Sequence, residues 1–558
     1  MHDTPLNPNR LGRPVVFWIG MLLISVGVLL AFQSFLGLRA SPGAPYVFTT
    51  RMAIALPIDV LGTCLAVFGI LPRGWLESRR QQRAGALSPP LSHREAETPL
   101  DAVASQPARA EHALGAMNAA PLNRKHWAII ARMYAGLVID TMKPATLGFM
   151  LPGMREEYGL SPAVVSLFPL AAVIGLTLGS VLFGMLGDLI GRRASFVLAS
   201  LILATTALCG FMPGYPWHLS TCFLMGLAAG GELPLIYTML AETMPARHRG
   251  WSGVALGGIG GLSGYLVASL LAGWLEPAFS WRVLWLPNLP TAILMLGLLR
   301  WVNESPRFLL QMGLVDEARR TMAKMGVAVG EGVGTQVGAA VNVRDLLGPL
   351  RGTTTTLCLF GFAWGLCNWG FITWLPDMLR NAGFDPGLAS RLLSLSALCA
   401  LPATCISAFT YGFWSSRWTA VVSASATAIV LLAFSACAPY LPGREGLVIG
   451  LTAALLVASS SMIGVLAPYS VELYPTALRG LGSGVVTGSS KSGGIVGPPL
   501  VGVLLTMFSS ASIPALAIAI PVAFAAIGIA WRGTETRGRT LEELEQMTAV
   551  AMPPSTGP

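Results

Sequence analysis

The ten residues "GMLGDLIGRR" (184–193) form a short polar break between two long apolar runs. Glycines such as Gly184 and Gly191 allow two helix ends to approach closely. The carboxylate of Asp188 can interact with a helix N-terminus or with an arginine. Arg192 and Arg193 are typical anchors at the inner face of a membrane. The stretch therefore predicts two spanning helices joined by a tight cytoplasmic loop.

Apolar runs like these two continue along most of the chain. Of its 558 residues, 53% are hydrophobic and only 11% are charged, and the mean hydropathy is +0.64. This composition is typical of a polytopic membrane protein and not of a soluble enzyme. Isolated strands would leave backbone groups unpaired in lipid, whereas helices satisfy them internally. We predict an all-α polytopic membrane protein with about fourteen spans.

The spans fall into an N-terminal pair and a set of twelve. Two apolar runs, 15–37 and 52–71, come first, and the earlier run is longer than a typical signal sequence, so we expect it to remain in the mature protein. The twelve others begin near residues 127, 162, 194, 219, 251, 282, 353, 387, 418, 447, 480 and 512. The predicted units are a two-helix membrane extension (1–72), a linker (73–125), a six-helix bundle (126–301), a loop (302–351), a second six-helix bundle (352–531) and a tail (532–558).

Arginines predict the orientation of these spans. They gather in alternate loops, which is the distribution of cytoplasmic loops in membrane proteins. The linker and the loop after the sixth core span belong to this basic set, so both termini are expected in the cytoplasm. We expect a multi-pass protein of a cell membrane, most readily a bacterial inner membrane.

Several classes of function find no support in the sequence. The net charge of +9 is spread over loops and forms no basic patch with interleaved aromatics, so we expect no nucleic-acid partner. The eight cysteines lie in or beside apolar runs without C-x-x-C or metal-ligand spacing. No nucleophile with a base and an acid is evident. We therefore expect no metal, no cofactor and no enzymatic activity.

A doubled motif points to two repeated halves. The element E-x-x-P-x-x-x-R-G begins at Glu242 and ends beside Arg249 in the first half, and it begins at Glu472 and ends beside Arg479 in the second. Such doubling is typical of transporters built from two repeated bundles, whose substrate site lies near the membrane midplane between them.

These motifs resemble those of a known family. The stretch 184–193 is similar to the major facilitator signature G-x-x-x-D-[RK]-x-G-[RK]-[RK], with Leu189 in place of the usual basic residue. "NESPRFLLQMGLVDEARR" (303–320) and "TETRGRTLEELE" (534–545) resemble the ends of the sixth and twelfth helices in its sugar-porter and organic-acid:proton symporter branches, which include metabolite, aromatic-acid and niacin permeases. The resemblance covers about 125 to 545 and nothing before 120.

The resemblance implies a charged gate at the cytoplasmic helix ends. Glu242 and Glu472 are expected to pair with arginines of the same region and to separate when the transporter changes state. The alternative is simple anchoring of helix ends at the membrane surface. The expected signature and gating residues are Gly184, Asp188, Gly191, Arg192, Arg193, Glu242, Arg249, Glu472 and Arg479.

The seventh core span favours an organic acid over a sugar. "GFAWGLCNWGFITWLPDML" (361–379) resembles the W-L-P helix of organic-acid symporters and lacks the Q-Q-x-x-G element of sugar porters. We predict that Asn368 and Trp369 contact the substrate, although an aromatic row can equally face lipid or pack in the core. The fifth core span lacks the G-P-x-x-G form of many drug antiporters, which favours uptake over efflux.

Four ionisable residues lie inside predicted spans. Asp140 and Lys143 occur in "GLVIDTMKPATLGFMLP" (136–152), Glu232 in the fourth core span and Lys491 in the eleventh. Related symporters often read D-G-[FY]-D where Asp140 is kept and Lys143 replaces the second acid. A basic residue in mid-membrane costs about 2.5–3.5 kcal/mol on insertion scales, so these charges are expected to be functional.

We predict that Lys143 and Lys491 hold an anionic substrate, while Asp140 and Glu232 carry protons. The alternative is charge neutralisation alone, with Asp140 paired to Lys143 at i, i+3 and Glu232 paired to Lys491. The leading hypothesis is proton-coupled uptake of a small organic anion by alternating access, with lipid as the surrounding partner. Transport of a neutral solute, export, and a non-transporting sensor that docks a cytoplasmic partner at its linker are the alternatives.

Overall fold

A computed structural model describes residues 13–39, 46–70, 120–299, 302–311, 315–326, 348, 350–474, 479–508 and 510–537. The predicted linker up to residue 119, much of the loop between the bundles and the tail from residue 538 lie outside these residues. The described ranges include nearly all of the two predicted six-helix bundles and most of the N-terminal extension.

Helices dominate both halves. The first half contains α5 (Arg124–Tyr158), α6 (Pro162–Val165), α7 (Leu167–Ile190), α8 (Arg192–Thr206), η1 (Ala207–Phe211), α9 (Tyr215–Thr243), α10 (Ala246–Ala278), η2 (Trp281–Trp285) and α11 (Asn288–Leu299). Two short helices come next, α12 (Pro306–Gln311) and α13 (Val315–Met325). The second half contains α15 (Arg351–Gly365), η3 (Leu366–Phe371), η4 (Ile372–Trp374), α16 (Leu375–Asn381), α17 (Pro386–Phe413), α18 (Ser416–Cys437), η5 (Ala438–Tyr440), α19 (Glu445–Leu473), α20 (Arg479–Phe508) and α21 (Ser512–Arg532).

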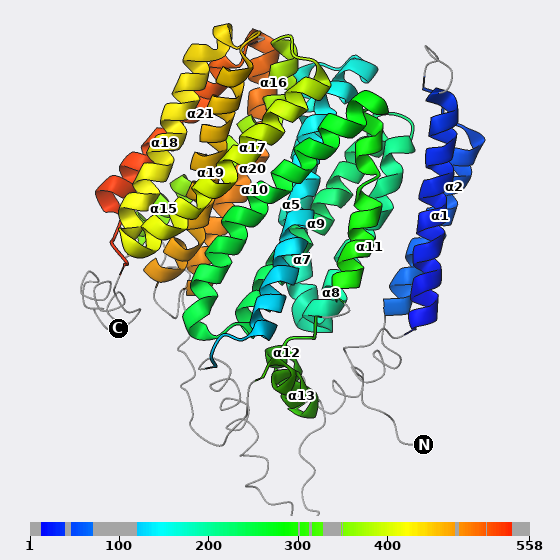
Figure 1. The fold of residues 1–558 in the computed structure, drawn as a ribbon, viewed down its shortest axis with the longest axis horizontal. Helices are drawn as coiled ribbons and strands as arrows, with labels where there is room; N and C mark the ends of the chain where they lie inside the picture. Colours follow the sequence, from blue (N-terminus) through cyan, green and yellow to red (C-terminus); the bar gives the residue numbers. More distant parts are fainter. Residues whose placement is uncertain are drawn as a thin grey trace, which may run out of the picture.

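The all-α membrane fold is confirmed. Among the described residues, 13 helices are long and apolar enough to cross a membrane. The helix α5 is not one of them, because Asp140 and Lys143 interrupt its apolar stretch, yet it runs through the first bundle like its neighbours (Figure 1). It is the fourteenth span. If η2 is counted as the start of the span that contains α11, the largest difference between a predicted and an observed start in the core is five residues. It occurs at α10, where residue 251 was expected and Ala246 is observed.

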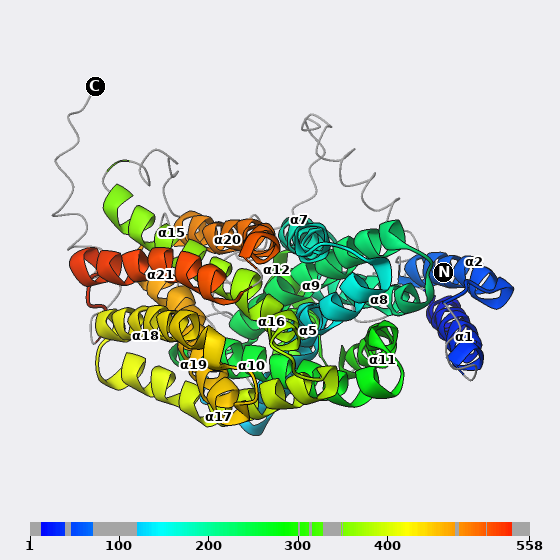
Figure 2. The same ribbon diagram turned by 90° about the horizontal axis from the view of Figure 1, so that it is seen from above.

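The two sets of six spans form two bundles that lie side by side (Figure 2). Helices α5, α7 and α10 of the first bundle contact α16, α20 and α17 of the second. Figure 1 shows α12 and α13 beneath one end of the molecule and α16 at the opposite end. We call these the α13 end and the α16 end.

Close helix packing within the first bundle depends on small residues, as is common in membranes. Helices α7 and α9 pack along their length. A Cβ atom on Gly226 would lie 1.9 Å from the carbonyl oxygen of Ala172, and one on Gly230 would lie 2.1 Å from that of Leu176. Any side chain at these two positions would force the helices apart.

The N-terminal extension forms a helical hairpin before the core, as predicted. Helices α1 (Pro14–Arg39) and α2 (Thr50–Ile70) pack together and lie against the first bundle, on the side away from the second (Figures 1 and 2). The Tyr46 hydroxyl donates to the carbonyl oxygen of Phe211 at 2.5 Å, and the guanidinium of Arg282 lies 3.6 Å from the centre of the Tyr46 ring. A polar contact and a cation–π contact therefore join the hairpin to the bundle.

Candidate functional site

The middle of the first bundle contains a buried ion pair. Lys143 on α5 donates from Nζ to Glu232 Oε2 on α9 at 2.7 Å, and neither side chain has exposed surface. The Ser200 hydroxyl on α8 donates to the other carboxylate oxygen, Oε1, at 3.0 Å. Burying two charges is costly unless both are paired and hydrogen-bonded. Three helices supply these partners, so the pair depends on how α5, α8 and α9 pack.

Asp140 adds a second carboxylate to this cluster. It lies one turn before Lys143 on α5 and is 4% exposed. It interacts electrostatically with both Lys143 and Glu232. Its Oδ1 atom is buried and accepts no hydrogen bond within the described part of the chain. With both acids ionised, two negative charges would therefore share one positive charge in a dry environment, which favours the uptake of one proton.

The observed pairing differs from both pairs considered in the charge-neutralising alternative. Lys143 pairs with Glu232 and not with Asp140, and Glu232 does not pair with Lys491. Lys143 also has no exposed side-chain surface, so it faces no open cavity in this conformation. Direct contact between Lys143 and a substrate would require the Lys143–Glu232 pair to open.

Lys491 lies between the two bundles. Its ammonium on α20 donates to the Ser180 hydroxyl on α7, which itself donates to the carbonyl oxygens of Leu176 at 2.9 Å and Gly230 at 3.0 Å. No carboxylate among the described residues pairs with this cation. Lys491 and Lys143 are both cationic, but only Lys143 has a carboxylate partner, Glu232, in the described structure.

The two other predicted substrate residues lie in an irregular part of the seventh core span. Asn368 and Trp369 belong to η3, a π-helical segment between α15 and α16, and such segments are frequent at functional sites. The Trp369 ring packs against Gly494 of α20, where an added Cβ would lie 2.7 Å from its Cδ1 atom. Gly494 lies three residues after Lys491, so Trp369 is close to the turn that carries the cation. Asn368 is half-buried.

At the α13 end of the first bundle, the signature loop is held by two glutamates. Gly191, between α7 and α8, has φ 99°, which favours glycine, and an added Cβ there would lie 2.5 Å from Glu304 Oε2. Arg192 donates to Glu242 Oε1 at 3.1 Å and to the carbonyl oxygen of Gly187 at 2.9 Å. Its backbone N–H donates to Glu304 Oε1 at 3.0 Å. Glu242 thus pairs with an arginine of its own bundle.

The second bundle repeats part of this arrangement. Glu535, after α21, accepts from the Ser416 backbone N–H at 2.9 Å at the start of α18, as Glu304, after α11, accepts at the start of α8. Burial raises the pKa of Glu304, against the effect of its backbone N–H donors. For Glu535 the hydrogen bonds from Ser415 and Ser416 outweigh burial, and the pKa falls to about 2. Neither glutamate was identified from the sequence, although "NESPR" and "TETRG" mark equivalent positions.

Glu472, the second-half counterpart of Glu242, pairs with no arginine of the described region. It accepts from the Tyr411 hydroxyl at 2.7 Å and from the Thr536 hydroxyl at 2.5 Å, both within its own bundle. The side chains of three predicted gating residues lie outside the described part of the structure, namely those of Asp188, Arg249 and Arg479. Gly184 lies in the last turns of α7. The gating role of all these residues stays a prediction.

The α16 end contains charged contacts that sequence reasoning missed. Arg155, near the end of α5, donates from Nη1 to Asp377 Oδ2 on α16 at 2.9 Å, and Arg380 on α16 pairs with Glu156 on α5. Both ion pairs join one bundle to the other.

An internal repeat could have identified these residues. "LPGMREEYG" (151–159) at the end of α5 and "LPDMLRNAG" (375–383) at α16 share their Leu-Pro, Met and final Gly positions. Both glycines have positive φ, 61° at Gly159 and 90° at Gly383. The first helix of each half therefore ends in the same way. Glu156 and Arg380 occupy equivalent positions in the two segments and have opposite charges, so they can pair across the bundles.

No group of three or more His, Cys, Asp or Glu residues within the described ranges could hold a metal ion. The site consists of a buried ionic cluster in the first bundle, a cation of the second bundle that binds Ser180 of the first, and polar contacts at both ends. This arrangement fits binding and conformational change better than covalent chemistry.

Comparisons with known proteins agree with this description. A family model described as "Sugar (and other) transporter" matches residues 134–548. The niacin transporter NiaP of Acinetobacter baylyi is 27% identical over 437 residues, which cover 76% of this chain and 97% of that protein. The 4-hydroxybenzoate transporter PcaK of Pseudomonas putida is 25% identical over 438 residues, which cover 75% and 94%.

The fold matches solved transporter structures. The xylose transporter XylE from E. coli, in a partially occluded inward open conformation, superposes with a TM-score of 0.60 at 16% identity, over 75% of this chain and 100% of that one. The extension before residue 120 lies outside the family match. One of the matching solved structures is described as a major facilitator superfamily protein, so this chain has that fold. The chain is a multi-pass membrane transporter and not an enzyme, and it belongs to the sugar (and other) transporter family.

Proposed function

We propose that this protein takes up a small organic anion, an aromatic monocarboxylate, together with protons. The observation that carries the proposal is the charge of the buried cluster. Asp140 and Glu232 share the single cation of Lys143 in the middle of the membrane. Ionisation of all three groups would leave one uncompensated negative charge there, so one proton is bound or released whenever access to the cluster changes.

Lys491 supplies the anion site in this proposal. Its ammonium has only a hydroxyl partner in the described structure, that of Ser180, and a carboxylate would bind it more strongly because both groups are charged. Trp369, beside Gly494, offers an aromatic face within about one turn of that cation. An aromatic carboxylate would therefore bind the Lys491 ammonium through its carboxylate group and pack its ring against Trp369.

Relatives support this class of substrate. Those named above are a niacin transporter and a 4-hydroxybenzoate transporter, and a gallate transporter of Pseudomonas putida is 26% identical over 425 residues. A solved relative of the same fold is described as a proton:xylose symporter. The substrates named for the first three proteins are aromatic acids, and the description of the fourth includes a coupled proton.

The ion pairs at the α16 end suggest how access alternates. The basic loops favour a cytoplasmic α13 end, and in that orientation Arg155–Asp377 and Arg380–Glu156 close the outer side. The contacts of Glu242 and Glu472 at the α13 end, in the part of the chain that the structure describes, instead stay inside single bundles. We infer an inward-facing state, in which substrate leaves Lys491 and a proton leaves the Asp140 cluster before the bundles rock back.

Proteoliposomes containing the purified protein test the proposal directly. Labelled nicotinate and 4-hydroxybenzoate should accumulate when the lumen is more alkaline than the outside, and a protonophore should abolish accumulation. Neutral nicotinamide and xylose should compete weakly. Uptake that ignores the proton gradient, or that xylose inhibits as well as the acids do, would overturn the assignment in favour of a neutral-solute carrier. Binding without any flux would indicate a sensor.

A further inference from the structure

Helix α9 lacks a regular backbone hydrogen bond at the turn that carries the acid of the buried pair. Pro234 lies inside α9, and proline has no N–H to donate to the carbonyl oxygen of Gly230, one turn earlier. Glu232 lies between these two residues and binds Lys143. We call the turn from Gly230 to Pro234 the α9 break. A carbonyl oxygen freed in this way inside a membrane needs another donor.

A hydroxyl of the neighbouring helix provides that donor. Ser180 on α7 donates to the carbonyl oxygens of Gly230 at 3.0 Å and of Leu176 at 2.9 Å. In a regular helix the Leu176 carbonyl already accepts from the backbone N–H of Ser180, so of the two it is Gly230 that needs the hydroxyl. The same hydroxyl oxygen accepts from the Lys491 ammonium. Ser180 therefore connects the cation of the second bundle with the α9 break.

Before the break, α9 is packed tightly against α7. A Cβ atom on Gly230 would lie 2.1 Å from the carbonyl oxygen of Leu176, and one on Gly231 would lie 2.4 Å from the Cδ2 atom of Phe183. Backbones that approach this closely form one packed unit, because a movement of either helix displaces the other. The part of α9 before the break is therefore expected to move together with α7.

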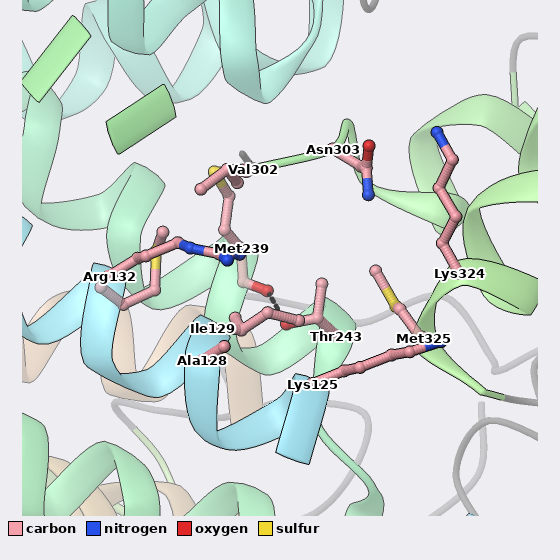
Figure 3. A pocket seen from close by; sticks show the side chains of 11 residues that line it. Lys125, Ala128, Ile129, Arg132, Met239, Thr243, Val302, Asn303, Lys324 and Met325 are labelled. Atoms are coloured by element: carbon pink, nitrogen blue, oxygen red, sulfur yellow. Dashed lines mark hydrogen bonds between the residues drawn. The ribbon is translucent and has the colours of Figure 1, made fainter. Parts of the chain in front are cut away.

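After the break, α9 borders a cavity of about 280 Å³. Met239 and Thr243 line it together with Ile129 of α5 and Val302 of the chain that comes after α11 (Figure 3). The Thr243 hydroxyl donates to the carbonyl oxygen of Met239 at 2.6 Å, so this turn of the helix is tied together. A packed interior deforms little, whereas a cavity can be filled. The segment after the break therefore has room to tilt that the segment before it lacks.

Glu232 lies at the junction of the two segments, among the other groups of the cluster. Lys143 and Asp140 face it from α5, and the Ser200 hydroxyl donates to it from α8 at 3.0 Å. Tyr237, on the segment after the break, interacts electrostatically with Asp140. A tilt of that segment changes the distances between the two acids and Lys143, and the proton affinity of the cluster depends on these distances.

We propose that the α9 break couples the anion site to the proton site and that Ser180 is its positioning residue. A carboxylate that binds Lys491 withdraws the ammonium from Ser180, and the hydrogen bond to Gly230 weakens because the hydroxyl is no longer polarised. The segment after the break then tilts, the Lys143–Glu232 pair lengthens, and the cluster binds one proton from the water on the open side. By linkage, the bound proton strengthens anion binding by the same factor. This inference rests on the proposed function, since it presupposes both sites.

Two transport assays on the same proteoliposomes separate coupling from binding. Counterflow of labelled nicotinate without a proton gradient reports binding and translocation. Accumulation driven by a gradient of one pH unit, after subtraction of uptake by protein-free liposomes, reports coupling. One proton carried with each monovalent anion gives an accumulation of about tenfold in wild type. Ser180→Ala should keep wild-type counterflow, while its accumulation should fall toward equal concentrations on the two sides.

Pro234→Ala tests the break from the other side. It gives the Gly230 carbonyl a backbone N–H donor, so its melting temperature should rise. Ser180→Ala removes the donor that this carbonyl has, so its melting temperature should fall. Both variants should nevertheless lose accumulation and keep counterflow, because in each the turn no longer responds to Ser180. Opposite changes in stability with the same loss of coupling are not expected of a purely structural contact.

Thr177→Val is the matched control. The Thr177 hydroxyl lies one turn before Ser180 on α7 and donates to the carbonyl oxygen of Val173 in its own helix, so this variant should accumulate nicotinate as wild type does. The inference fails if Ser180→Ala or Pro234→Ala accumulates like wild type, if the control loses accumulation equally, or if counterflow is lost together with accumulation. Wild type that shows counterflow without gradient-driven accumulation would overturn the proton coupling of the proposed function, and this inference with it.

Discussion

The two bundles repeat one architecture but distribute their charges differently. In the first, Lys143 and Glu232 form a pair with no exposed side-chain surface, beside Asp140. In the second, Lys491 occupies the middle of α20 and reaches a hydroxyl of the first bundle. Buried charges must be compensated, and here the first bundle compensates its cation internally, whereas the cation of the second bundle has only a hydroxyl partner among the described residues. The two bundles repeat one scaffold, and this difference in charge is the basis for the proposed division between a proton site and an anion site.

The ends of the bundles differ in a related way. At the α16 end, two ion pairs join the ends of equivalent helices of the two bundles, Arg155 with Asp377 and Arg380 with Glu156. At the α13 end, Glu242 and Glu472 each bind inside one bundle. In the proposed alternating-access cycle, contacts of the first kind must break when the bundles rock, whereas contacts of the second kind can persist.

Removal of the first bundle's cation should have the largest effect. Lys143→Ala leaves Glu232 buried without its partner, which costs about 3–5 kcal/mol. Thermal unfolding in detergent should show a large loss of melting temperature, and proton-driven uptake should be abolished. The double variant Lys143→Ala with Glu232→Ala should recover much of the melting temperature but not the gradient-driven uptake. Full gradient-driven uptake by the double variant would show that the pair is structural and not coupled to protons.

Removal of the second bundle's cation should affect substrate affinity more than stability. Lys491→Gln deletes a charged hydrogen bond to the carboxylate, which is worth about 1.5–3 kcal/mol, so KM for the anion should rise at least about tenfold. The melting temperature should change little because no acid is left unpaired. Lys491→Arg should retain most of the affinity, and Ser180→Ala should leave it nearly unchanged. An unaltered KM for Lys491→Gln would remove this residue from the anion site.

A smaller effect is expected where the bundles meet at the α16 end. Arg155 is 31% exposed, so its pair with Asp377 is partly screened, and its loss should cost about 1 kcal/mol. Hydrogen exchange of α16 should become faster by about fivefold in Arg155→Ala and in Asp377→Ala, and the two changes should not add. The exposed Arg444→Ala at another loop of the second bundle serves as control. Additive changes would mean that the two side chains do not interact across the bundles.

The smallest effects concern the equivalent glutamates at the α13 end, and they should have opposite pH dependence. The pKa of Glu535 lies at about 2, below its ordinary 4.5. Its stabilising contribution is therefore complete above pH 4.5 and is lost as the pH falls toward 2. Burial raises the pKa of Glu304 instead, so its contribution is complete below pH 4.5 and is lost as the pH rises through the raised value.

Melting curves between pH 3 and 7 of Glu535→Gln and Glu304→Gln against wild type would separate these cases. The melting temperature of Glu535→Gln should lie below that of wild type by an amount that shrinks with acidification. The change should be at most a few degrees because Glu535 is partly exposed. For Glu304→Gln, the difference in melting temperature from wild type should grow with acidification. Parallel pH profiles for the two variants would show that the equivalent positions do not differ in environment.

Much of the fold can be predicted from the sequence because lipid imposes a simple rule: each span needs about 20 apolar residues with its backbone bonds satisfied internally. The start of α6 at Pro162 and that of α21 at Ser512 coincide with the predicted starts. The repeated motifs also predict two bundles, because Glu242 and Glu472 occupy equivalent elements. These features are local, so the chain encodes them without reference to distant residues.

The choice of partners is not local. From the sequence, Asp140 is three residues from Lys143 and is an available partner, yet Lys143 binds Glu232, which is 89 residues away on α9. The spacing of residues along a helix determines which side chains share a face. The packing of α5, α8 and α9 against one another determines which of those side chains come into contact. The same holds for Lys491 with Ser180, 311 residues apart, and for Arg155 with Asp377, 222 residues apart. The sequence by itself determined the spans, the repeat and the presence of buried charge, and only the packing of helices from both bundles decided where that charge is compensated, because compensation depends on distances of a few ångströms between separate helices.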